Sequence, residues 1–308
     1  MFRKLFHYFY SGILRRKKMA SAELSPGREL KEQMLCEINT IRSYGLNDEL
    51  ASEVRVHEIR KSLKRIRALL KLLKPNLPER TYYRLDKNIG KAASSLTLMR
   101  ESAVNLRTFI ELFQKNESAL PSALSQKIIN SLTDQVNAAY KMSRENFHST
   151  LVSLGIYMNK FERSLSTLRV NNLGRAELIN TIDKSYIKSV QAYRDAMQTL
   201  DTEIIHSWRK QAKTLLIQLK YAPHKPVQQP ESLINKLDHL TELLGKEHDL
   251  AVLEEVLYNN MGLEKEERQK IHLLVSKSRA KLKKQAFESG KMLFSQEVLQ
   301  TRRAGFTA

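Results

Sequence analysis

Hydrophobic residues recur at spacings of three and four along most of this chain, a pattern typical of amphipathic helices. The clearest segment is HEIRKSLKRIRALLKLLK, residues 57–74, in which only Glu58 is acidic. Its apolar face consists of Ile59, Leu63, Ile66, Leu70 and Leu73. Its opposite face consists of His57, Arg60, Lys61, Lys64, Arg67, Lys71 and Lys74. Because solvated faces normally mix both signs of charge, this face favours a polyanionic partner, with a plain cationic solvent face as the alternative.

The same periodicity predicts a first helix over residues 28–44 that stops at Gly45. Asn47 or Asp48 is expected to cap the basic helix, and prolines at 75 and 78 are expected to end it. Later helical runs are predicted over residues 79–114, 118–168, 176–220, 231–259 and 263–300. Gly90 marks a candidate kink, and the run 118–168 is read as either one helix or two helices that divide at Gly155. The clearest turn is NNLG at 171–174, and a loop with three prolines spans 223–230.

Composition agrees with this helical pattern and adds a strong charge. With 10 Gly and 7 Pro in 308 residues, and few segments that alternate at period two, the chain is expected to be nearly all helical. Its 52 Lys and Arg against 33 Asp and Glu give a net charge of +19, which indicates nucleic acid, an anionic membrane or another polyanion as partner. Cys36 is the single cysteine, so we expect no disulfide, no thiolate metal cluster and a reducing, cytoplasmic location. No apolar run approaches about 20 residues, so no transmembrane helix is predicted.

Residues 1–27 differ from the rest of the chain. MFRKLFHYFYSGILRRKKM mixes aromatic and aliphatic residues with a basic cluster, and we expect this extension to be disordered. One alternative is that residues 1–18 contact an anionic membrane as an amphipathic segment, and another is a translation start at Met19. The extension lacks the features of a secretory signal. Ser25, Pro26 and Gly27 are expected to break the chain before the first helix.

An internal repeat organises the remaining chain. HEIRKSLK at 57–64 recurs as HSWRKQAK at 206–213, with identical His, Arg, Lys and Lys at an offset of 149. At an offset of 148, SLTLMRESAV at 95–104 corresponds to LLGKEHDLAV at 243–252. Two pairs in the same order predict two similar helical halves, residues 28–170 and 171–308.

Each half thus presents one basic row on a helix. Positions i, i+3, i+4 and i+7 share one line, so each row is roughly 10 Å long. Two rows that face each other would line one groove, in which an anionic chain accepts charge-assisted hydrogen bonds from both sides. Histidines add charge when protonated. Glu101 and Asp249 are expected to orient Arg100, His248 or a neighbouring lysine.

At these residues the chain resembles the CHAD family, the conserved histidine α-helical domain, over about residues 28–300. The matching segments are HEIRKSLKRIR at 57–67, HSWRKQAK at 206–213, LLGKEHDLAVL at 243–253 and AFESGKMLF at 286–294. The resemblance implies an all-α fold of two four-helix bundles related by a pseudo-twofold axis. It also implies a basic central pore or groove that binds inorganic polyphosphate. Some members localise to polyphosphate granules, and others are fused to a triphosphate-hydrolysing domain of the CYTH type, for which this chain shows no match.

The resemblance also supplies candidate polyphosphate-binding residues. Matching motif positions are His57, Arg60, Lys64, Arg65, Arg67, Arg100, His206, Arg209, Lys210, Lys213 and His248. The basic helix faces add Lys61, Lys71 and Lys220. The sequence departs from the pattern at 95–97, where a glycine is favoured, and at Thr214 and Leu216, where the first half has two arginines. These departures leave open whether the two halves contribute equally.

Other chemistry has less support in the sequence. HEIRK is not H-E-x-x-H, because Lys61 occupies the place of the second zinc-binding histidine, and no metal site is predicted. KEHD at 246–249 offers an acid–base pair, but no nucleophile, glycine-rich phosphate loop or carboxylate cluster for Mg²⁺ accompanies it. Trp208 lies on the apolar face of its helix and is interpreted as a core residue.

The predicted function is therefore non-catalytic binding of inorganic polyphosphate, with no cofactor, at polyphosphate granules or elsewhere in the cytoplasm. The first alternative is a nucleic-acid-binding protein, which the net charge supports equally. That alternative lacks an aromatic stacking platform and a recognised DNA- or RNA-binding motif. The second alternative is an enzyme that hydrolyses polyphosphate or triphosphates.

Overall fold

The computed structural model describes residues 25–223, 231–260 and 262–294, and these residues are helical with no β-strand. The helices are α2 (Pro26–Leu46), α3 (Ser52–Leu73), α4 (Glu79–Ser94), α5 (Thr97–Gln114), α6 (Ser122–Ser166), α7 (Arg175–Thr199), α8 (Thr202–Tyr221), α9 (Glu231–Asn260) and α10 (Lys265–Phe294). Short 3-10 turns follow α3 and α5 at Lys74–Asn76 and Glu117–Ala119. The predicted all-α class is confirmed. None of the described helices combines the length and apolar character needed to cross a bilayer.

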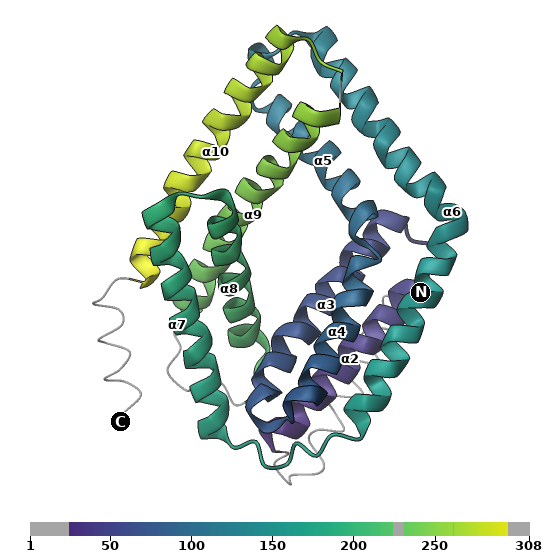
Figure 1. The fold of residues 1–308 in the computed structure, drawn as a ribbon, viewed down its shortest axis with the longest axis vertical. Helices are drawn as coiled ribbons and strands as arrows, with labels where there is room; N and C mark the ends of the chain where they lie inside the picture. The colour runs from purple at the N-terminus through teal and green to yellow at the C-terminus, as the bar shows by residue number, and fades with distance from the viewer. Residues whose placement is uncertain (1–24, 224–230, 261, 295–308) are drawn as a thin grey trace.

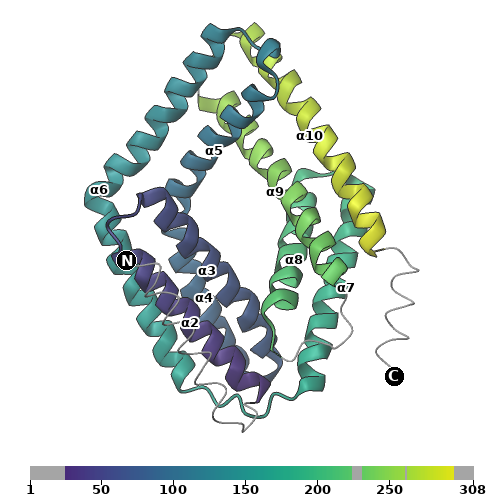
Figure 2. The same ribbon diagram turned by 180° about the vertical axis from the view of Figure 1, so that it is seen from behind.

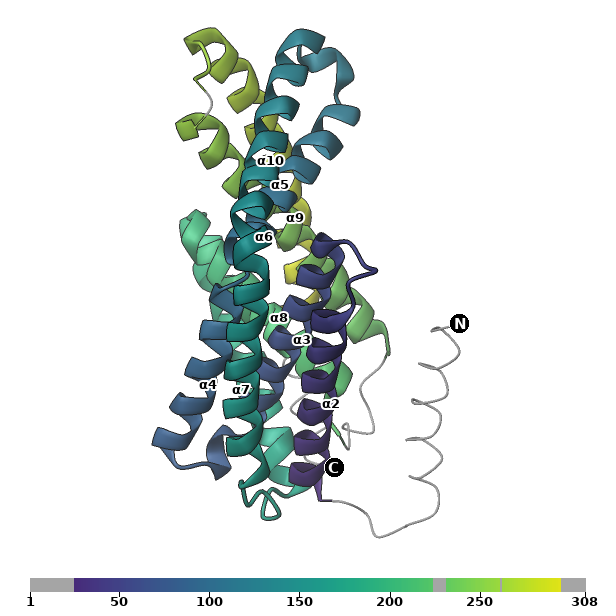
Figure 3. The same ribbon diagram turned by 90° about the vertical axis from the view of Figure 1, so that its right-hand side faces the viewer.

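The helices form two groups that face each other across the molecule (Figure 1). Helices α2 to α6 make one group and α7 to α10 the other, and the view from behind shows the same division (Figure 2). The groups meet where α3 packs against α8, and again where α5 packs against α9. Seen from the side, the α5–α6 tip and the α9–α10 tip cross (Figure 3).

Two buried apolar clusters hold the groups together. The larger one contains the whole predicted apolar face of α3, from Ile59 to Leu73, together with side chains of α8. The smaller one joins the crossed tips through Phe109 of α5 and Leu253 of α9. Burial of these faces on both groups fixes α3 and α8 side by side, so their polar faces point into the space between the groups.

Trp208 is fully buried, which confirms its interpretation as a core residue. Its ring stacks on Phe287, with centroids 5.4 Å apart. A Cβ atom at Gly290 of α10 would lie 2.7 Å from Tyr193 and 2.8 Å from Trp208, so only glycine allows α10 to approach these rings. This contact gives a structural reason for the glycine in the segment AFESGKMLF.

The predicted start of the helical body and the predicted cap of α3 are wrong. Pro26 and Gly27 do not break the chain but begin α2, because the fixed backbone angle of proline suits the first turn of a helix. At its other end α2 passes Gly45 and ends at Leu46. The N-cap of α3 is Ala51, with no capping side chain, rather than Asn47 or Asp48.

Interior breaks also differ from the predictions. Helix α4 continues through Gly90 and ends at Ser94, and α6 runs without interruption through Gly155. The predicted run 176–220 is divided between α7 and α8 by Leu200, whose φ is 55°, and by the N-cap residue Asp201. The turn predicted at 171–174 does separate α6 from α7.

Several predictions fall outside the described residues. They are the disordered extension and membrane contact of residues 1–24, most of the loop 223–230, and the last helix beyond 294. The internal duplication stays a prediction. Where the first group has α4 and α5 separated by Ser95 and Leu96, the second group has the single helix α9.

Candidate functional site

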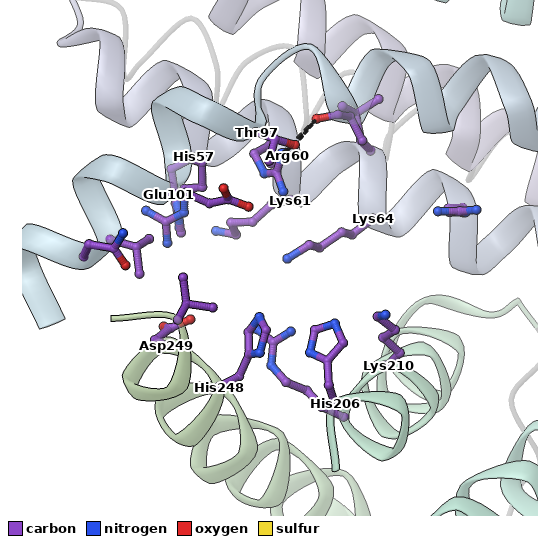
Figure 4. A pocket seen from close by; sticks show the side chains of 18 of the residues that line it. His57, Arg60, Lys61, Lys64, Thr97, Glu101, His206, Lys210, His248 and Asp249 are labelled. Atoms are coloured by element: carbon purple, nitrogen blue, oxygen red, sulfur yellow. Dashed lines mark hydrogen bonds between the residues drawn. The ribbon is translucent and has the colours of Figure 1, made fainter. Parts of the chain in front are cut away.

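A cleft of about 480 Å³ lies between the two groups of helices. Helices α3, α4 and α5 form one wall and α8 and α9 the other, and their side chains point toward one another (Figure 4). The ionisable lining residues are His57, Arg60, Lys61, Lys64, Arg67, Arg100, Glu101, His206, Arg209, Lys210, His248 and Asp249. Seven Lys and Arg side chains and three histidines therefore face two carboxylates. The cleft is strongly cationic.

The structure brings ten of the fourteen predicted binding residues into this cleft, from both walls. The four that it does not bring there are Arg65, Lys71, Lys213 and Lys220. Arg65 turns toward α2, where its Nη1 lies 3.1 Å from both carboxylate oxygens of Glu37. Lys71 donates to a hydroxyl of α8 at 3.3 Å, and Lys220 donates to Asp238 at 2.5 Å. Lys213 also faces Asp238, at 3.9 Å.

Local helix geometry positions the walls. Asp201 caps α8 by accepting hydrogen bonds from the backbone N–H groups of residues 203 and 204 at 2.9 and 3.1 Å, which fixes the start of the helix that carries His206. The break at Leu96 redirects the chain, so that α5 presents Arg100 and Glu101 to the cleft. Gln218 of α8 is fully buried and donates to the backbone carbonyl of Ala68 in α3 at 3.1 Å, which ties the two walls together.

Five cations of the cleft have no anionic partner among the described residues. They are Arg60, Lys64, Arg100, Arg209 and Lys210, and Arg60 donates only to a backbone carbonyl and a hydroxyl. Arg67, at the edge of the cleft, differs from them because it makes a two-pronged ion pair with Asp86 at 2.7 and 2.8 Å. The acidic side chains of the cleft, Glu101 and Asp249, were expected to orient neighbouring cations. Neither makes an ion pair within 4.0 Å to a described residue.

Burial lowers the pKa values of several cleft cations, and for Lys64 and Arg100 neighbouring cations add to the effect. Lys64 reaches the solvent of the cleft but is surrounded by protein on most sides, and burial lowers its pKa to about 8 with help from Arg209, Arg60 and Arg100. Burial also lowers the pKa of each of those three arginines. The pKa of Asp249 is raised by burial, although Arg209 and Arg100 oppose the rise. Positive charge is therefore poorly compensated throughout the cleft.

His206 and His248 form a stacked pair on the second wall, with ring centroids 4.0 Å apart and an interplanar angle of 31°. Burial lowers their pKa values to about 4 and about 3, and Lys210 and Arg209 contribute. Nδ1 of His206 is buried and has no hydrogen-bond partner among the described residues. The pKa of His57 on the other wall is lowered by burial and by Arg100. Both rings of the stacked pair are thus neutral near pH 7 when the cleft is empty.

Sequence reasoning missed Thr97 as a partner of the basic row. Arg60 donates from Nη1 to Thr97 Oγ1 at 3.2 Å and to the backbone carbonyl of Ala93 at 2.8 Å. The available signal was the segment 95–97, at which the chain departs from the motif to which it was compared. In the described part of the chain no group of three or more His, Cys, Asp or Glu side chains is placed to hold a metal ion.

The fold and this site define a class: an all-helical protein whose two groups of helices enclose a cationic cleft with histidines in both walls. The model of the CHAD domain family matches residues 45–258, more than half of the chain, and the chain belongs to that family. Membership supports a polyphosphate-related role.

Solved structures show the same fold. PptA from Streptomyces chartreusis is similar with a TM-score of 0.64 at 14% identity, over 89% of this chain and 99% of that chain. The CHAD domain from the plant Ricinus communis is similar with a TM-score of 0.55 at 18% identity, over 94% of each chain. At these identities the likeness is one of fold alone. No curated protein matches the sequence.

Proposed function

We propose that this protein binds inorganic polyphosphate in the cationic cleft without cleaving it. The observation that carries the proposal is the set of cations from both walls that lack an anionic partner among the described residues, namely Arg60, Lys64, Arg100, Arg209 and Lys210. A phosphate chain offers closely spaced oxygens, which accept paired donors from arginine and single donors from lysine. Such a ligand supplies the negative charge that these cations lack among the described residues.

The lining favours polyphosphate over nucleic acid. No Phe, Tyr or Trp of the described residues lines the cleft, whereas single-stranded nucleic acid binders use aromatic rings to stack bases. Trp208 of α8 is buried in the core and offers no platform. A ligand made only of phosphates needs no such platform. Its charge density also matches a cleft in which cations outnumber carboxylates.

The donor set supports binding without catalysis. Mg²⁺-assisted phosphoryl transfer uses carboxylates to hold the metal and to position the nucleophile. Here the two carboxylates, Glu101 and Asp249, lie among arginines and lysines. We propose a holding role, either at polyphosphate granules or on dispersed polyphosphate.

A competition experiment tests the proposal. Labelled long-chain polyphosphate is bound to the protein and then displaced by unlabelled polyphosphate, single-stranded DNA or duplex DNA at equal phosphate concentration. We expect polyphosphate to displace the label far better than either DNA. Equal competition by DNA would refute polyphosphate as the ligand. Incubation with polyphosphate and Mg²⁺ should release no orthophosphate, and release would show that the protein is an enzyme.

Charge-matched variants locate the binding site. The double variant K64A/K210A removes two cleft cations, and K277A/K281A removes two exposed lysines of α10 outside the cleft. The slope of log affinity against log salt should fall by about 0.7 per cleft cation removed, by analogy with single-stranded nucleic acids. The α10 variant should keep the wild-type slope. Similar losses in both variants would mean that the protein binds through its net charge and not through the cleft.

A further inference from the structure

The two arginines at equivalent motif positions, Arg60 and Arg209, lie in different surroundings although both line the cleft. Arg60 donates hydrogen bonds from Nη1 to two acceptors of its own wall, the Ala93 carbonyl at 2.8 Å and the Thr97 hydroxyl at 3.2 Å. Arg209 makes no hydrogen bond or ion pair to the described residues, and its Nε is buried without a partner.

The cause lies in the helix that each arginine faces. At the offset of 148, Thr97 corresponds to Gly245, and a Cβ built at Gly245 would lie 3.9 Å from both Nε and Nη2 of Arg209. Glycine offers this arginine no side-chain acceptor. In addition, α9 is continuous at this point, whereas the end of α4 at Ser94 leaves the Ala93 carbonyl open to Arg60.

The hydroxyl of Thr97 is oriented for this restraint. It donates to the Ala93 carbonyl at 3.3 Å, so its lone pairs face Arg60. A hydrogen bond already formed within the protein has to be given up, or shared, before the same donor can bind a phosphate oxygen. The terminal guanidinium nitrogens of Arg209 have no such competing acceptor among the described residues.

We infer that the two walls contribute unequally to anion binding. Arg209 is the principal phosphate-binding arginine, whereas Thr97 restrains Arg60. Residues 97 and 245 therefore determine how much affinity each wall contributes. This inference rests on the proposed function, since it takes polyphosphate as the ligand of the cleft.

Single-residue variants test the inference by polyphosphate titration at fixed salt and pH. Arg209→Ala should lower affinity by about tenfold more than Arg60→Ala. Gly245→Thr gives Arg209 the hydroxyl that Arg60 has, whereas Gly245→Val adds the same bulk without an acceptor. Affinity of G245T should be about fivefold below that of G245V. Thr97→Val is isosteric but has no hydroxyl, so it removes one of the two acceptors of Arg60 and should raise affinity. The gain should be only about twofold, because the Ala93 carbonyl still accepts a hydrogen bond from Arg60.

The matched pairs separate this inference from folding defects and from the proposed function. G245T and G245V add the same number of side-chain atoms to one helix position, and thermal melts monitored by circular dichroism check that both stay folded. Equal losses for R60A and R209A, or equal affinities for G245T and G245V, would overturn the inference while polyphosphate binding stands. A wild-type protein that does not bind polyphosphate would overturn the proposed function as well.

Discussion

Affinity for polyphosphate should rise as the pH falls from 7.5 to 5.5. The groups responsible are His206 and His248, whose pKa values in the empty cleft are about 4 and about 3. They face Lys64, Arg209 and Lys210, and a bound polyanion neutralises these cations. Binding therefore raises both histidine pKa values. At any pH between the pKa values of the free protein and those of the complex, the complex holds more protons than the free protein.

The size of the effect follows from these shifts. If the ligand restores each histidine to its ordinary pKa of about 6.5, each one contributes about tenfold in affinity between pH 7.5 and 5.5. The pair together contributes up to about a hundredfold. The rise should stop once the pH passes below the free-state values of about 4 and about 3, because both forms are then protonated.

Calorimetric titration at constant ionic strength gives the affinity at each pH. Repeating it in two buffers of different ionisation enthalpy counts the protons taken up. The matched variant is H206Q/H248Q, which keeps polar side chains but does not titrate. It should show a nearly flat profile, with only the contribution of His57 remaining. An equally steep profile in the wild type and in this variant, or a flat profile in the wild type, would refute the reasoning.

Three further outcomes concern the stability of the protein. G290A should lose about 1–3 kcal/mol in urea denaturation, because the added methyl would lie 2.8 Å from Trp208; an unchanged midpoint would mean that α10 can move away without loss. K64Q should raise the melting temperature of the anion-free protein by about 2 °C by removing a repelled charge, and should reduce the temperature gained on adding polyphosphate; a lower melting temperature would contradict this. The anion-free protein should lose stability as the pH falls from about 6.5 toward 4, because unfolding lets His206 and His248 take up protons, and a scan with polyphosphate present should show a smaller loss.

Local patterns in the sequence predicted the helices better than their ends. The apolar face of α3 could be predicted because the three-and-four spacing follows from helix geometry alone, and all five of its residues are buried. The division of the run 176–220 was missed, although Asp201 followed by Thr202 and Glu203 is a capping signal. The end of α7 at Leu200 could not be predicted from this residue, because a left-handed backbone at leucine is uncommon.

The direction of each cation could be predicted only in part. The repeated motif placed His57 and His206 on equivalent helix faces, and both line the cleft. Whether a neighbouring cation lines the cleft or pairs with a carboxylate depends on the helices that pack beside it. Arg65 pairs with Glu37 of α2, and Lys220 pairs with Asp238 of α9, at separations along the chain that periodicity does not connect. The partners of such cations come from tertiary packing.

The distribution of these pairs is itself an argument about the site. Arg67, at the rim, has a carboxylate partner, while Lys64 and Arg209, farther in, have none among the described residues. Burial of unpaired cations lowers stability, and their mutual repulsion adds to the loss, as the reduced pKa of Lys64, about 8, records. Local rules are broken in this way mainly where function requires it. An anion that enters the cleft relieves the repulsion, so the same charges that weaken the empty protein provide the free energy of binding.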